Sequence, residues 1–80
     1  MSGDNINDLE MAMYETLVPG RLQIKVAMLI VRAFGTDDFP AEDSINAALE
    51  RLAERQDIET FGMIKRWRHS EIRRLSTTSA

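Results

Sequence analysis

The sequence predicts one small domain of three helices followed by a segment that forms either a β-hairpin or a fourth helix, so its class is α+β or all-α. Three observations support this prediction. The chain has 80 residues, 44% of them hydrophobic and 29% charged, which is typical of a single globular domain. Apolar residues recur with helical spacing in three segments that proline or glycine separates. After residue 57 the pattern changes to short runs rich in β-forming residues.

The first helix is expected at residues 5–17. Asn5 is a good N-cap, because its side-chain oxygen can accept hydrogen bonds from free backbone N–H groups of the first turn. Pro19 disfavours a helical conformation in the residue before it and so ends the helix. Residues 1–4 are expected to be a flexible N-terminus. Four apolar residues share one face of this helix: Ile6, Leu9, Met13 and Leu17.

The second helix is expected at residues 20–34, ending at Gly35. The many β-branched residues of this segment would also suit a strand, but a run of this length without a turn signal favours a helix. Its apolar residues fall on two faces, and a domain of this size has difficulty covering both. The second face is therefore a candidate dimer surface, unless the first helix and the C-terminal segment cover both faces. The first face comprises Leu22, Val26, Leu29, Ile30, Ala33 and Phe34, and the second comprises Ile24, Met28 and Val31.

The third helix, at residues 40–55, is the clearest amphipathic one, with an apolar stripe of Ile45, Ala48, Leu49 and Leu52. Beyond it, a β-forming run at residues 58–61 and an alternating stretch at 72–74 favour a hairpin from about 57 to 75. Helical spacing of apolar residues over 61–75 favours a fourth helix, and periodicity alone leaves both open. We expect a single domain over residues 5–75 and a flexible tail at 76–80.

The order of three helices and then two strands is that of a winged helix-turn-helix. The stretch from Ala48 to Glu59 resembles the end of the third helix of such a domain entering its wing. Gly62 and the run from Trp67 to Arg73 (Trp-Arg-His-Ser-Glu-Ile-Arg) are similar to a bacterial domain family of unknown function with winged-helix-like organisation. That family is usually found C-terminal to another uncharacterised domain. The resemblance implies a β-hairpin wing, so we expect an α+β winged helix-turn-helix, and it brings no enzymatic activity.

The composition offers few groups for catalysis. There is no cysteine and only one histidine, which excludes disulfides, thiolate zinc sites and cysteine nucleophiles. His69, Ser70 and Glu71 are the residue types of a hydrolytic triad, but adjacent residues of a strand point to opposite faces and cannot form a relay. The four glycines lie apart, so none forms a phosphate-binding loop. We therefore expect no catalytic residues, no metal and no cofactor.

Charge is distributed unevenly along the chain. Thirteen acidic and ten basic residues give a net charge of −3. Residues 1–20 carry four acidic groups and no basic one, whereas residues 61–80 carry five basic groups against Glu71. The expected third helix has four carboxylates and two arginines, which is the wrong polarity for entering the phosphate field of DNA. The charge pattern favours a protein partner over nucleic acid.

We expect a cytoplasmic protein that docks onto another protein or onto a second copy of itself through its wing. No apolar run is long enough for a membrane span, and the N-terminus lacks the pattern of a signal peptide. The alternative function is a DNA-binding transcriptional regulator that reads mainly through the wing. Trp67 is either a docking anchor or a core residue, with the arginines around it solvated or paired with the first helix. The candidate interaction surface comprises Lys65, Arg66, Trp67, Arg68, Arg73 and Arg74.

Overall fold

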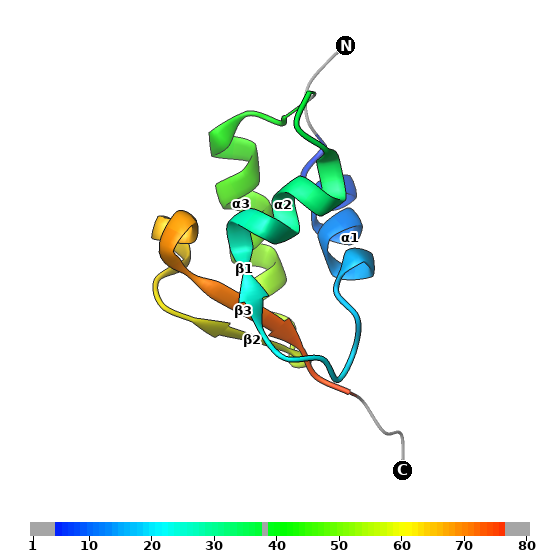
Figure 1. Ribbon diagram of the computed structural model, residues 1–80. Coiled ribbons are helices and arrows are strands. Elements are labelled where there is room, and N and C mark those ends of the chain that lie inside the picture. Colours follow the sequence, from blue (N-terminus) through cyan, green and yellow to red (C-terminus); the bar gives the residue numbers. More distant parts are fainter. Residues whose placement is uncertain (1–4, 38, 77–80) are drawn as a thin grey trace.

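The computed structural model describes residues 5–37 and 39–76 and places three helices against a three-stranded antiparallel sheet (Figure 1). Residues 1–4 and 77–80, expected to be flexible, lie outside the described part of the chain. The strand order is β1-β3-β2, and a 3-10 helix connects β2 to β3. The elements are α1 (Ile6–Thr16), β1 (Ile24–Lys25), α2 (Val26–Phe34), α3 (Glu42–Ala53), β2 (Ile58–Phe61), η1 (Ile64–His69) and β3 (Glu71–Arg74).

The expected α+β class is confirmed, and the all-α alternative is wrong. Residues 58–61 and 71–74 pair as antiparallel strands, with Thr60 opposite Ile72. Gly62 opens the connection between these strands with a φ of +94°, a conformation that side-chain-bearing residues rarely adopt. A Cβ at this position would also lie 3.3 Å from the Ser70 hydroxyl. None of the helices in the described residues is long and apolar enough to cross a membrane.

Helices α1 and α3 lie within two residues of their expected bounds. The Asn5 side chain accepts hydrogen bonds from the backbone N–H groups of Asn7 (3.0 Å) and Asp8 (3.4 Å), which confirms the predicted N-cap. The apolar faces of both helices meet in one core, to which Met13 of α1 and Leu49 of α3 contribute fully buried side chains. Local sequence signals therefore suffice for these two elements.

Helix α2 begins at Val26, so the expected start at residue 20 is wrong. Residues 24 and 25 form β1 instead, with Ile24 opposite Ile72 of β3. The backbone N–H of Gly20 also donates to the Arg74 carbonyl (2.9 Å), and this pairing keeps the segment extended. Leu22, expected on a buried face, is 80% exposed as a result.

The candidate dimer surface of Ile24, Met28 and Val31 is not one helix face. Ile24 lies in the sheet and packs against the core, whereas Met28 and Val31 remain exposed on α2. Leu29 and Ile30, on the other side of α2, are fully buried. The apolar residues of this segment thus belong to a strand and a helix that pack on one core. Met28 and Val31 are left as a small exposed apolar area.

We predict that Leu29→Ala lowers the free energy of unfolding by about 2–5 kcal/mol, because it removes a fully buried side chain and leaves a cavity. The neighbouring exposed position provides the control, and Met28→Ala should change this free energy by less than about 0.5 kcal/mol. Urea denaturation measures both values. Equal losses for the two variants would contradict the orientation of α2.

Candidate functional site

Trp67, one of the expected docking residues, lies in the core rather than on the surface. It belongs to η1, between β2 and β3, and only 4% of it is exposed. The 3-10 helix packs against both α2 and α3, and Figure 1 shows it beside these helices at one end of the sheet. Trp67 therefore fixes the β2–β3 connection (residues 62–70) to the helices and does not itself present a contact surface.

Arg68 is exposed but engaged. Its guanidinium lies 4.4 Å above the Trp67 ring, and its Nη1 is 2.9 Å from Oε2 of Glu42 at the start of α3. Both members of this ion pair are more than half exposed, so its contribution to stability is small. The pair nevertheless reduces the net charge that Arg68 offers to a partner.

Arg73 and Arg74 are held within the fold. Arg73 Nε lies 2.8 Å from Glu59 Oε1 across the β2–β3 ladder. Arg74 Nη1 donates to the backbone carbonyls of Tyr14 (3.2 Å) and Leu17 (3.3 Å) near the end of α1. The Arg74 guanidinium also lies 3.9 Å from the centre of the Tyr14 ring. Arg74 thus joins the sheet to α1, whereas Arg73 is paired within the sheet.

Lys65 and Arg66 are the expected site residues that remain available. Both are exposed, and neither forms an ion pair within residues 5–37 and 39–76. Arg66 interrupts the 3-10 helix with a φ of −110° and a ψ of 58°. Met63, 65% exposed, lies on the same connection, and Phe61, 36% exposed, lies at its start. The structure therefore reduces the predicted basic surface to two free cations beside two apolar side chains.

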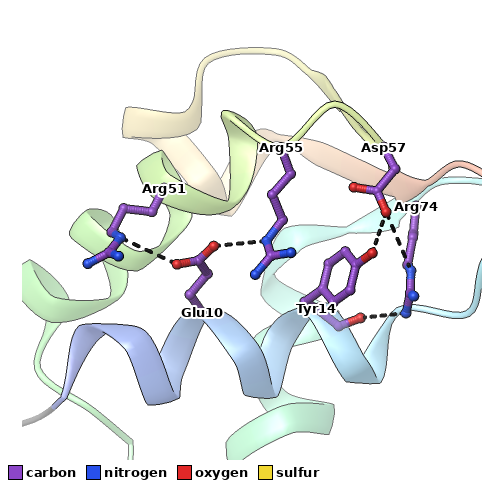
Figure 2. A network of polar contacts seen from close by, with 6 residues as sticks. All are labelled: Glu10, Tyr14, Arg51, Arg55, Asp57 and Arg74. Atoms are coloured by element: carbon purple, nitrogen blue, oxygen red, sulfur yellow. Dashed lines mark hydrogen bonds and ion pairs between the residues drawn. The ribbon is translucent and has the colours of Figure 1, made fainter.

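A polar network joins α1 to α3 and the sheet (Figure 2). Glu10 of α1, largely buried, forms ion pairs with Arg51 Nε of α3 (3.3 Å) and with Arg55 Nε (2.8 Å), which lies two residues beyond the end of α3. Figure 2 shows the Arg55 side chain extending toward Tyr14, and its guanidinium is 4.2 Å from the Tyr14 ring centre. The Tyr14 ring thus has one guanidinium near it from the α3–β2 turn and another from β3, an arrangement that cation–π attraction stabilises.

Asp57 completes this network at the turn between α3 and β2. It accepts a hydrogen bond from the Tyr14 hydroxyl, and its Oδ2 lies 4.0 Å from Arg74 Nε. Within residues 5–37 and 39–76, the expected pairing of the acidic first helix with the basic C-terminal segment is found for Arg74, which contacts the Tyr14 ring and the carbonyls of Tyr14 and Leu17. Glu10 instead forms ion pairs with Arg51 and Arg55. No local sequence signal identifies these partners, because they lie more than 40 residues apart.

Ser70 has a structural part in the connection. Its side chain is buried, and its hydroxyl can donate to the carbonyls of Met63 and Arg66, the latter 3.0 Å away. These contacts close the turn at the start of β3. His69 is exposed beside it. Among the described residues, no three histidine, aspartate or glutamate side chains gather in a group that could hold a metal ion.

No protein-family model, curated protein or solved structure matches this chain. The resemblance of residues 62–73 to a bacterial domain family therefore stays a prediction.

The burial of Trp67 predicts a fluorescence signature, since it is the only tryptophan in the chain. The folded protein should emit at shorter wavelength than the protein in urea, and iodide should quench it less, because water and ions do not reach the indole. The unfolded chain serves as the reference for both measurements. Emission and quenching that do not change on unfolding would mean that Trp67 is solvated in the native state.

We predict that Tyr14→Phe lowers the free energy of unfolding by about 1–3 kcal/mol, because the Asp57 carboxylate loses its hydroxyl donor at a partly buried position. Glu15→Gln, at the adjacent exposed position, should change it by less than about 0.5 kcal/mol. Thermal and urea denaturation followed by circular dichroism measure these values. An unaltered stability of Tyr14→Phe would show that the hydroxyl contact is not formed in solution.

Proposed function

We propose that this chain is a cytoplasmic, non-enzymatic docking module with a winged helix-turn-helix fold, and that its wing binds an acidic surface of another protein. The observation that carries the proposal is the display of Lys65 and Arg66 on a connection that the buried Trp67 holds in place. Met63 adds an exposed apolar contact beside these charges. Such a combination of apolar area and free cations suits a partner that offers carboxylates around an apolar patch.

The element order supports the fold named in this proposal. Helix α3 is followed by β2, and β2 and β3 form the hairpin that we identify with the wing. Residues 62–70 connect its two strands. Strand β1, between α1 and α2, adds a third strand on the other side of β3. The wing differs from a plain hairpin turn because it contains η1 and its buried tryptophan.

The surface of α3 favours a protein partner over DNA. In DNA-binding winged helices the third helix enters the major groove. Here Arg51 of α3 and Arg55, just beyond the end of this helix, form ion pairs with Glu10 of α1. The exposed carboxylates of α3 would meet DNA phosphates with like charge, so the counterion-release contribution to affinity is lost on this helix. These carboxylates are Glu42, Asp43 and Glu50, with Glu54 just beyond the helix end.

Charge reversal at the wing tests the proposal. Immobilised wild-type protein should capture its partner from a cell extract, and Lys65→Glu/Arg66→Glu should reduce the recovery by at least about tenfold, since each lost charge contact is worth about 1 kcal/mol or more. The double variant Arg21→Glu/Arg32→Glu changes the net charge equally at exposed positions elsewhere and should retain the partner. Equal recovery with all three proteins would refute docking through the wing.

The DNA alternative is tested by salt dependence. We expect no binding of a mixed-sequence duplex at about 50 mM salt, as measured by fluorescence anisotropy. A wing that contacts two phosphates through Lys65 and Arg66 would instead bind DNA with a log–log salt slope of about −1.8, because each contact contributes about −0.9. Such a slope, abolished by Lys65→Glu/Arg66→Glu, would establish nucleic acid as the partner.

A further inference from the structure

A hollow of about 330 Å³ lies where the α1–β1 loop passes α2 and β3. Residues 16–18 and 21–24 form one side of it, and Arg32 of α2 with Arg73 and Arg74 of β3 complete the lining. None of the residues 62–70 takes part, so this hollow is separate from the β2–β3 connection that carries Lys65 and Arg66. We call it the arginine hollow.

The charge of the arginine hollow is of one sign. Four guanidinium groups line it, and no carboxylate does. Arg73 and Arg74 have acidic neighbours in Glu59 and Asp57. Arg21 and Arg32 are exposed and form no ion pair with any carboxylate of the described chain. Because a guanidinium stays protonated and presents parallel N–H donors, these two residues offer permanent positive charge suited to a carboxylate.

The remaining lining is mainly apolar. Leu17 and Ile24 provide buried or partly buried surface, and Val18 and Leu22 add apolar side chains that are about half and 80% exposed. An apolar group placed here would remove part of this surface from water, which is favourable. The lining therefore suits a ligand with an apolar body next to its negative charge.

Hydrogen bonds restrain the α1–β1 loop that lines the hollow. The Gly20 N–H donates to the Arg74 carbonyl (2.9 Å), and the Arg21 N–H donates to the Val18 carbonyl (3.3 Å). Arg74 Nη1 bonds the Leu17 carbonyl from the other side (3.3 Å). A loop tied at these points loses little freedom when a ligand enters, as is usual for largely pre-formed small-molecule sites.

We propose that the arginine hollow binds a small organic monocarboxylate with an aliphatic chain. The carboxylate pairs with Arg21 and Arg32, and the chain lies along Leu17, Leu22 and Ile24. The volume favours a small molecule, since it is at the lower end of the range of about 300–1,000 Å³ for such sites. A stable protein interface needs a far larger contact, about 800 Å² on each partner.

Octanoate is the probe that tests this site, with backbone and arginine Nε resonances followed by 15N NMR. It should shift Leu22, Ile24, Arg21 and Arg32 in a saturable way and leave Lys65 and Arg66 unchanged. Arg21→Gln/Arg32→Gln should raise the Kd for octanoate at least about tenfold, through the loss of charge-assisted hydrogen bonds. The matched control Lys65→Gln/Arg66→Gln should leave the Kd unchanged.

Further ligands separate the contributions of charge and apolar surface. 1-Octanol and inorganic phosphate should each bind at least about tenfold more weakly than octanoate, because each lacks one of the two features. Three results would overturn the proposal: no shift at Leu22 and Ile24, equal binding of octanol, or an unchanged Kd in Arg21→Gln/Arg32→Gln. Tighter binding of the peptide acetyl-Ala-Ala-Leu would also overturn it, since the ligand would then be the end of a protein chain. Loss of wing docking in a capture experiment does not affect any of these readouts.

Discussion

Arg74 makes the contacts on which the arrangement of α1, the α1–β1 loop and the sheet depends. Carbonyls at the end of a helix lack their usual N–H partners four residues on. Arg74 donates to the carbonyl of Tyr14, in the last turn of α1, and to that of Leu17, just after it, and adds positive charge at the negative end of the helix dipole. Its guanidinium lies against the Tyr14 ring, whose hydroxyl is bound by Asp57. One side chain of β3 thereby places α1 relative to both strands of the hairpin.

The same network sets the orientation of α3. Glu10 is shared by Arg51 of α3 and by Arg55, just beyond the end of that helix, so rotation of α3 about its axis would separate a largely buried carboxylate from its partners. With these arginines turned toward α1, the carboxylates of α3 remain on the outside. The acidic character of the exposed α3 surface is therefore a consequence of packing as well as of composition.

Sequence patterns predict the helices whose caps and apolar faces are encoded within a few turns. They miss strand pairing between residues far apart in the sequence. Asn5 and the apolar spacing around Met13 and Leu49 correctly placed α1 and α3, because caps and amphipathic faces are encoded within a few turns. The start of α2 was wrong because Ile24 takes its extended conformation from Ile72 of β3. The fourth-helix alternative had good spacing around Trp67, and strand pairing on both sides of the connection overrides it.

The charge distribution along the chain predicts the basic segment, but it does not show which of its residues form ion pairs in the fold. Five basic residues in one segment predicted a basic surface, and its acidic partners lie in other elements: Glu42 for Arg68, Glu59 for Arg73 and Asp57 for Arg74. Only the folded chain distinguishes Lys65 and Arg66 from these. The arginine hollow has no sequence signal at all, because Arg21, Arg32 and Arg73 come from three separate segments.

The burial of Trp67 has a consequence for the speed and entropy of association. A long hairpin connection normally fluctuates, and a partner that orders it pays about 0.5–1.5 kcal/mol for each mobile side chain it immobilises. Here the buried indole of η1, which packs against α2 and α3, and the Ser70 hydroxyl bonds restrain the backbone that carries Lys65 and Arg66. The docking that we propose would therefore proceed as a rigid association without a slow ordering step, and the dissociation rate would set the lifetime of the complex.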